Sequence, residues 1–294
     1  MFRKDRRNPG VSARKFLSAL HDWTAAVSCA YVRRHIVTAP IRFAPPRSKG
    51  ADMAVKCDNC PLRELEIFVP FTTEEARFMK GFKIGELTVD AQTPLLIEGS
   101  NAPQLYTVLA GQGVRFKTLE DGRRQVVNFV FPGDFIGLQA GVMGEMGHSI
   151  TSATEMTLCV FDRAEIWSLF KSHPDRAFDL TWLAASEEMF LGESLATIGQ
   201  RSALEAVAWT LQRLFQRGEA LGLTTANEMP LPFRQQDLAD ALGLSLVHTN
   251  KTLAKLKDRG MVLWQDGVLG ILDRTGLSDV AGIPMEALRP RPLI

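Results

Sequence analysis

Apolar and polar positions follow two different periods along this chain, and the change of period divides it into segments. Between about residues 95 and 161, short runs rich in β-branched and aromatic residues are separated by glycine turns, which is typical of a small antiparallel barrel or jelly roll. Asp121-Gly122 predicts a hairpin between two of these runs. The runs are Leu95–Ile97, Leu105–Leu109, Val114–Phe116, Gln125–Phe131 and Met156–Phe161.

A helical period replaces the strand pattern after Pro174, a residue that suits the first turn of a helix running to about Gly199. Along this helix a stripe recurs in alternating steps of four and three residues, which is the spacing of a coiled-coil seam and predicts a homodimer. The alternative is that the stripe packs against the protein's own barrel. The predicted seam consists of Leu180, Ala184, Glu187, Leu191, Ser194 and Ile198. Shorter helices are expected around Thr72–Lys80, Arg163–Phe170 and Leu204–Phe215.

Residues 233–256 have the pattern of two short helices joined at Gly243, which can adopt a positive φ in the turn. Ala239 is small where the two helices must cross closely, and Ser245 is the expected N-cap of the second helix. This spacing is that of a helix-turn-helix, and an αα-hairpin inside a core is the plain alternative. The inner face of the second helix is expected to contain Leu244, Val247 or Thr249, Leu253 and Leu256.

The charges around this second helix favour DNA. No Asp or Glu occurs from Ala241 to Lys257, whereas Lys251, Lys255 and Lys257 are all basic. An acid-free, basic helix suits a groove lined by phosphates, so the predicted partner is double-stranded DNA, and a dimer implies a two-fold operator. Two further β-rich runs flank Asp266-Gly267 and predict the hairpin wing of a winged helix.

Net charge is distributed unevenly along the 294 residues. Residues 1–50 hold 11 Lys/Arg against Asp5 and Asp22, so a total of +1 leaves the other 244 residues at −8. A DNA site in the body of the chain must therefore be a local patch. No apolar run reaches the roughly 18 to 20 residues that span a bilayer, and four cysteines do not form a disulfide framework in a chain of this length. A cytoplasmic protein that does not enter the membrane is expected.

Composition changes at Met53, where the patterned sequence begins after a basic, proline-containing stretch. Met53 is a candidate alternative to Met1 as the start, and a basic arm on DNA is the other interpretation of that stretch. The predicted domains are a basic extension at 1–52, either untranslated or disordered, a sensor β-roll at 53–165, a dimerisation helix region at 166–200, a winged helix-turn-helix at 201–276 and a tail at 277–294.

Small barrels also occur in metal-dependent enzymes, so the candidate ligands matter. The five histidines include no close pair, and only His148 lies in the barrel region, whereas catalytic metal sites normally use three or more ligands. We therefore predict no catalytic residues and no enzyme. A redox or small-ligand enzyme built on the barrel is the alternative from another class.

A barrel, a long helix and a winged helix-turn-helix in this order resemble the Crp/Fnr family of bacterial transcription regulators. The similar segments are Pro94–Gly99, Leu105–Gly113, Phe131–Gly137 and Arg234–Ser245, and the likeness covers roughly Cys57 to Asp273. The resemblance implies an α+β fold with a β-roll like that of cyclic-nucleotide-binding domains. It also implies a homodimeric transcription regulator that works with RNA polymerase.

The family's effector sites are altered in this chain. Cyclic-AMP-binding members hold the ribose with a Glu and the cyclic phosphate with an Arg, at positions similar to Leu138 and His148. Because loss of the guanidinium removes a bidentate clamp on the anion, cyclic AMP is not the expected effector.

The oxygen-sensing branch of the family holds a [4Fe–4S] cluster with four cysteines. Cys57 and Cys60 match the first two, Glu66 stands at the third position, and Cys159 lies near the fourth. The resemblance leaves open an iron–sulfur cluster, a redox switch or metal bridge at Cys57 and Cys60, and a pair without function. A regulator that has no effector and is controlled by its abundance is a further alternative.

The family's base-reading positions correspond to Val247 and Lys251, with His248 and Asn250 nearby. Val247 can touch a thymine methyl group, Lys251 can reach guanine and Asn250 can pair with adenine. Phosphate contacts are expected from Arg234 and Ser245, and Lys255 completes the predicted DNA-binding set. The operator should therefore differ from those of the best-known relatives.

Overall fold

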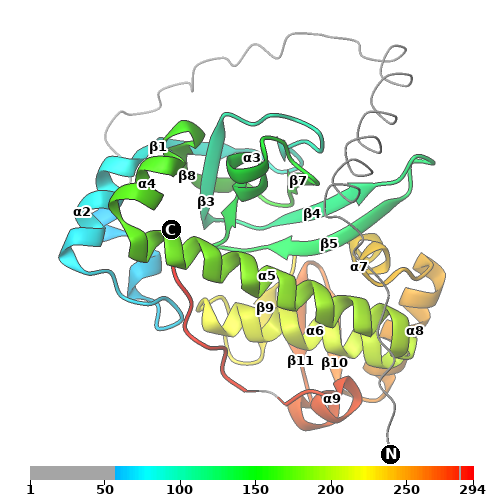
Figure 1. The fold of residues 1–294 in the computed structure, drawn as a ribbon. Coiled ribbons are helices and arrows are strands. Elements are labelled where there is room, and N and C mark those ends of the chain that lie inside the picture. The colour runs from blue at the N-terminus through cyan, green and yellow to red at the C-terminus, as the bar shows by residue number, and fades with distance from the viewer. Residues whose placement is uncertain (1–56, 285) are drawn as a thin grey trace, which may run out of the picture. The chain divides into compact units, whose positions relative to one another are not determined.

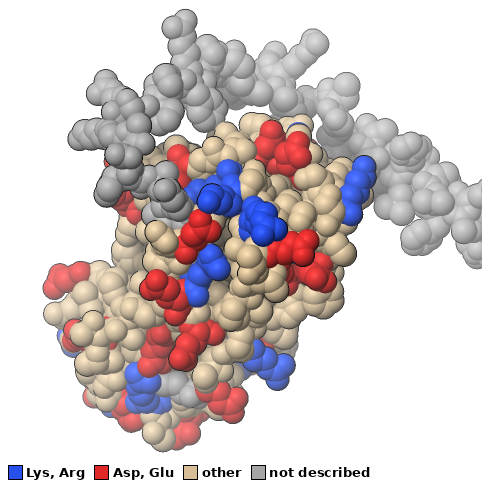
Figure 2. Space-filling model, turned by 90° about the vertical axis from the view of Figure 1, so that its left-hand side faces the viewer, with Lys and Arg blue, Asp and Glu red and all other residues tan. Residues whose placement is uncertain are grey.

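The computed structural model describes residues 57–284 and 286–294. The predictions about residues 1–52 and the alternative start at Met53 lie outside these residues. No helix of the described part is long and apolar enough to cross a membrane. Figure 2 shows acidic and basic side chains interspersed over one face of the molecule, so this face carries no field of a single sign.

The sensor domain is a β-roll built from two four-stranded antiparallel sheets, whose strand orders are β1-β8-β3-β6 and β2-β7-β4-β5 (Figure 1). Buried side chains from both sheets, including Val108, Ile150 and Leu158, form one core cluster between them. The strands are β1 (Lys83–Val89), β2 (Pro94–Leu96), β3 (Gln104–Ala110), β4 (Gly113–Thr118), β5 (Arg124–Val130), β6 (Phe135–Ile136), β7 (Ser149–Ser152) and β8 (Met156–Asp162).

All five predicted runs are strands, and Gly122 takes a φ of 84° in the β4–β5 hairpin, as predicted. The patterning missed β1, β6 and β7. β1 lacked a recognisable period because most of its positions are half-buried and it contains Lys83 and Glu86. β6 has only two residues, which is too short to show a period.

Helices flank the β-roll on its N- and C-terminal sides. Thr72 is the N-cap of α2 and forms a reciprocal capping box with Glu75. α5 is 27 residues long, about 40 Å at 1.5 Å per residue, and starts at the predicted Pro174. The helical segments are η1 (Cys57–Asn59), η2 (Pro61–Glu64), α2 (Thr73–Phe82), α3 (Leu138–Met143), η3 (Arg163–Glu165), α4 (Ile166–Ser172) and α5 (Pro174–Gln200).

The winged-helix domain is organised around α6, whose Val207, Leu211 and Phe215 are fully buried. Asp266 and Gly267 both have positive φ in the predicted wing hairpin, which a third strand, β9, extends into the order β10-β11-β9. Neither β9 nor α9 was predicted from the sequence. The predicted end of the winged-helix domain, at residue 276, falls inside α9. The elements are α6 (Ala203–Ala220), β9 (Glu228–Pro230), α7 (Gln235–Leu242), α8 (Leu246–Asp258), β10 (Val262–Gln265), β11 (Val268–Ile271) and α9 (Arg274–Ala281).

The last residues of the chain return from α9 to the sensor domain, as the red trace in Figure 1 shows. Arg291 forms a parallel β-bridge with Phe68, and Leu293 and Ile294 are each only 4% exposed. The segment expected to be a tail is therefore packed at its far end against the β-roll.

Candidate nucleic-acid interface

α7 and α8 form the predicted helix-turn-helix. Gly243 ends α7 with a φ of 65°, the left-handed conformation that favours glycine. The Leu244 N–H donates to the carbonyl oxygen of Ala239 over 3.1 Å, and the Ala239 side chain is completely buried. The small residue and the glycine thus perform the roles that the sequence predicted for them.

The orientation of α8 is set by its N-cap and its inner face. Ser245 Oγ accepts from the His248 N–H at 3.2 Å, which confirms Ser245 as the N-cap. Of the two candidates for the inner face, Thr249 is buried, whereas Val247 is 64% exposed. Thr249 is accommodated there because its hydroxyl donates to the Ser245 carbonyl oxygen over 3.2 Å.

The outer face of α8 presents the predicted reading residues to solvent. Val247, Lys251 and Lys255 follow one another at steps of four and share one line along the helix, while His248 and Asn250 lie beside them and are also exposed. Neither Lys251 nor Lys255 takes part in an ion pair among residues 57–284 and 286–294. Neither ammonium group is therefore neutralised by a carboxylate of the described part of the chain.

Arg234, a predicted phosphate contact, is the N-cap residue of α7 and its side chain is mostly exposed. Its Nη2 lies 2.9 Å from Asp237 Oδ1, and Arg124 of β5 binds the same carboxylate. Burial alone would raise the pKa of Asp237, but hydrogen bonds from Arg234 and Arg124 hold this pKa below its ordinary value. The first helix of the motif is therefore joined to the sensor domain through a charged Asp237.

The predicted dimer seam on α5 divides into two faces. Leu180 is buried in a core cluster of its own chain, and Glu187 Oε1 lies 2.6 Å from Arg115 Nη1 of β4. Leu180 and Glu187 therefore face the protein's own sensor domain. This agrees with the alternative prediction that the stripe packs against the barrel of the same chain. Ser194 is half-buried, whereas Ala184, Leu191 and Ile198 are exposed beside Leu195, which is 72% exposed. The apolar stripe open to a partner runs through these last residues.

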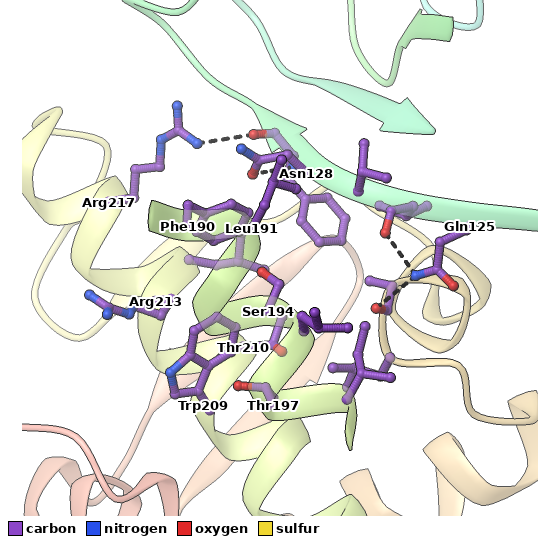
Figure 3. A pocket seen from close by; sticks show the side chains of 18 residues that line it. Gln125, Asn128, Phe190, Leu191, Ser194, Thr197, Trp209, Thr210, Arg213 and Arg217 are labelled. Atoms are coloured by element: carbon purple, nitrogen blue, oxygen red, sulfur yellow. Dashed lines mark hydrogen bonds between the residues drawn. The ribbon is translucent and has the colours of Figure 1, made fainter. Parts of the chain in front are cut away.

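A cavity of about 390 Å³ lies between β5, α5, α6 and α7 (Figure 3), and Leu191, Leu195 and Ile198 of this stripe form part of its lining. Phe190, Leu191 and Trp209 form part of its largely apolar wall. Gln125 spans from β5 to α7, because its Nε2 donates to the Ala241 carbonyl oxygen over 3.1 Å. Arg217 of α6 similarly donates to the Phe129 carbonyl oxygen over 3.0 Å. The cavity thus marks the junction of the sensor, the long helix and the winged-helix domain.

A second cavity, of about 450 Å³, contains the two positions that correspond to the cyclic-nucleotide contacts of relatives, Leu138 and His148. Burial, with Arg115 and Lys117 nearby, lowers the pKa of His148 to about 3, so its imidazole is neutral at physiological pH. Arg115 is already paired with Glu187, and Leu138 cannot hydrogen-bond to a ribose. These residues do not fit a cyclic phosphate.

Cys159 of β8 meets the Cys57 and Cys60 pair, about a hundred positions earlier in the chain, at a third cavity. Cys57, Cys60 and Cys159 line it together with Lys83. Burial raises the pKa of Cys159 to about 11 and also raises that of Cys57, so these thiols are protonated near neutral pH. The fold therefore brings together the three cysteines that the sequence analysis grouped.

These thiols do not fit an iron–sulfur cluster in this arrangement. The cavity measures about 40 Å³, which is room for roughly one water molecule. Glu66, at the position of a third cysteine in the oxygen-sensing branch, is exposed and does not line the cavity. Within the described residues, no group of three His, Cys, Asp or Glu side chains is arranged to hold a metal ion.

Comparison with known proteins agrees with this architecture. Residues 86–173 match the model of the cyclic nucleotide-binding domain, and residues 205–280 match that of the Crp-like helix-turn-helix domain. The nitrogen fixation regulation protein FixK of Bradyrhizobium diazoefficiens is 34% identical over 169 residues, which are 57% of this chain and 70% of that protein. The chain belongs to the Crp/Fnr family of transcription regulators.

Other members of the Crp/Fnr family are similar over comparable lengths. The transcriptional activatory protein AadR of Rhodopseudomonas palustris is 31% identical, over 59% of this chain and 72% of its own. The transcriptional activator protein FnrL of Cereibacter sphaeroides is 26% identical, over 70% and 84%. The solved structure of FixK2 from Bradyrhizobium japonicum has the same fold, with a TM-score of 0.60 at 23% identity over 66% of this chain and 96% of that one.

Membership of this family confirms the predicted fold and the predicted DNA-binding transcription regulator, in its Fnr-like branch. It also decides against the barrel enzyme, since the family and these relatives are regulators.

Ion pairs that were not predicted from the sequence join the domains. Asp134 of the β-roll binds both Arg217 of α6 and Arg291 near the end of the chain. Asp134 lies inside the recognised Phe131–Gly137 segment, but its partners are 83 and 157 positions away. No local pattern could have identified them.

Proposed function

We propose that this Crp/Fnr regulator binds a two-fold DNA operator as a homodimer and changes its DNA affinity in response to a signal at the sensor domain. The observation that supports DNA reading most strongly is the exposed outer face of α8, which presents Val247, Asn250, Lys251 and Lys255 within a stretch, Ala241 to Lys257, that contains no Asp or Glu. Such a face fits the major groove, in which phosphates surround the base edges.

Each residue of this face has a contact suited to its chemistry. Lys251 donates to O6 or N7 of guanine, Val247 packs on a thymine methyl group, and Asn250 pairs with adenine. Arg234 and Ser245, at the N-termini of the two helices, contact backbone phosphates and fix the register without reading bases.

The homodimer forms along α5. Leu191, Leu195 and Ile198 are exposed on a helix about 40 Å long, and a second copy of the helix would cover them. Two-fold pairing places two α8 helices for half-sites about one helical turn apart, roughly 34 Å. The dimer would then recruit RNA polymerase at promoters, in the cytoplasm where the DNA lies.

The signal enters through one of two sites. The cavity of about 450 Å³ near His148 borders α5 through Ala184, Glu187 and Leu191, so a small molecule there would contact the dimer helix. The thiols of Cys57, Cys60 and Cys159 offer a redox-sensitive site. Either event acts by shifting a population between DNA-competent and DNA-incompetent arrangements of α5 and the winged-helix domain.

Stoichiometry and specificity together test this proposal. Light scattering coupled to size exclusion should give two chains in solution and two chains per operator duplex. Fluorescence anisotropy should show at least about a thousand-fold preference for the operator over random duplex at the same salt concentration. A monomer on the operator, or equal affinity for both duplexes, would contradict it.

A further inference from the structure

The segment from Ile283 to Ile294 is fastened first to the winged-helix domain. Gln212 of α6 donates through Nε2 to the Ile283 carbonyl oxygen over 3.0 Å. One turn further along α6, Gln216 donates to the Pro284 carbonyl oxygen over 3.1 Å. The start of the segment must therefore move with α6.

Its far end is fastened to the sensor domain through both backbone and side chain. The Arg291 N–H donates to the Ile67 carbonyl oxygen over 2.8 Å, and the Val69 N–H donates to the Arg291 carbonyl oxygen over 2.9 Å. The guanidinium of Arg291 lies 3.1 Å from Asp134 Oδ1 and 3.3 Å from the Gly133 carbonyl oxygen. This is a specific docking site, because four hydrogen bonds hold one residue.

Beyond Arg291, the last residues of the segment, its tip, form part of the wall of the cysteine cavity. Leu293 and Ile294 line that cavity together with the three thiols. Arg176, in the first turn of α5, donates to the Leu293 carbonyl oxygen over 3.2 Å, and the Thr107 hydroxyl of β3 donates to Ile294. The tip thus contacts the thiol site, the β-roll and the long helix at once.

The cysteine cavity is small, so a group bound inside it competes for space with Leu293 and Ile294. The cavity holds about 40 Å³ and Leu293 and Ile294 form part of its wall, so a larger group attached to Cys60 or Cys159 and lying inside the cavity would press against these two side chains. The protein interior is too closely packed to provide the extra volume elsewhere without a rearrangement.

We propose that residues 283–284 and 286–294 act as a strap that couples the cysteine cavity to the winged-helix domain. The docked strap supports DNA binding, and a group that enlarges the contents of the cavity releases it. The coupling is reciprocal, so releasing the strap also exposes the thiols. This inference rests on the proposed function, because it explains how a change at the thiols would alter DNA binding by α8.

Docking favours DNA binding because it limits the freedom of the winged-helix domain. The outer face of α8 is already exposed while the strap is docked, so the strap does not block the reading surface. A two-fold operator requires two α8 helices at fixed positions, and a domain held in place loses less conformational entropy when it binds.

Two arginines of the strap provide a matched pair of variants. Arg291→Ala removes the contacts to Asp134 and Gly133, whereas Arg289→Ala changes the same charge at an exposed position. Ile294→Ala separately removes part of the tip. For each full-length variant, peptide mass spectrometry measures the rate at which iodoacetamide alkylates Cys57, Cys60 and Cys159, and anisotropy measures operator affinity.

Arg291→Ala and Ile294→Ala should raise the alkylation rate of Cys60 or Cys159 at least about tenfold and weaken operator binding about three- to thirtyfold, while Arg289→Ala should change neither. Alkylated wild-type protein should also show faster hydrogen exchange in segments 67–69 and 286–294. Unchanged thiol reactivity, or operator affinity that stays the same or rises in the strap variants, overturns the strap. Failure of the wild-type protein to prefer its operator would instead overturn the proposed function.

Discussion

Arg124 of β5 donates from Nη2 to Asp240 Oδ2 of α7 over 2.8 Å, although 116 positions separate the two residues. The same guanidinium binds Asp237, which also pairs with Arg234. One arginine of the sensor domain thus holds two carboxylates of the first helix in the DNA-binding motif. The pair with Asp240 is mostly shielded from water, with 22% and 15% of the two side chains exposed, so it should contribute more than a surface ion pair.

Arg124→Ala should release α7 from β5. A double-mutant cycle with Asp240→Ala, read from chemical denaturation, should give a coupling of about 1–2 kcal/mol between the two side chains. Arg123→Ala is the matched control, because Arg123 is 77% exposed and its ion pair is with Asp121 of the same hairpin. A coupling energy indistinguishable from zero would show that this contact does not join the domains.

Lys251→Ala should weaken operator binding by about 1–3 kcal/mol and relax the preference at one base pair, because Lys251 is proposed to donate to guanine. Lys257→Ala is the control, since that lysine is also exposed but lies about 120° round the helix from Lys251. Titrations against operator and random duplex at one salt concentration separate the two roles. Equal losses on both duplexes would make Lys251 a phosphate contact.

Leu195→Asp should dissociate the dimer while leaving the monomer folded, because the side chain is exposed in the single chain and each dimer carries two copies. Losing two buried leucines should cost about 3 kcal/mol or more, which is a hundredfold or greater rise in the dimer dissociation constant. Leu272→Asp introduces the same change at another exposed leucine and should leave the dimer intact. Analytical ultracentrifugation distinguishes these results, and a dimer that tolerates Leu195→Asp would move the interface elsewhere.

His148 should make the protein less stable in acid. Its pKa is about 3 in the folded protein and 6.5 as the ordinary value, so the unfolded chain takes up the proton first as pH falls. The stability associated with a neutral His148 is complete above pH 6.5 and declines below it, by up to about 2 kcal/mol at pH 5. His148→Gln should flatten this part of the pH profile in urea denaturation. An unchanged acid slope would mean that His148 does not titrate as its burial implies.

Much of this fold could be predicted from short sequence patterns, because turns and helix caps are determined by residues that are close in the sequence. The positive φ at Gly243, the cap at Ser245 and the wing turn at Asp266-Gly267 each depend on a few neighbouring residues. The reading face of α8 was likewise predictable, since helical spacing determines which side chains share a face. The ambiguity between Val247 and Thr249 was resolved only by packing, which buries the threonine.

Contacts between residues far apart in the chain could not be predicted from the sequence. The helical period identified a stripe on α5 but could not tell which part meets the β-roll, because Leu180 and Glu187 find their partners in other elements. Leu293 and Ile294 looked like part of a tail, since nothing near them in the sequence indicates a docking site on β3 and α5. The cysteines were grouped through a family resemblance, and their shared cavity became visible only in the fold.

Selection of duplexes from a random pool by the purified, full-length protein tests the central claim most directly. After several rounds at physiological salt, the enriched sequences should form an inverted repeat whose half-site centres lie about one helical turn apart. Each half-site should contain the guanine assigned to Lys251 and the thymine assigned to Val247. A pool that shows no enrichment, or a single half-site bound by one chain, would contradict a two-fold, sequence-specific regulator.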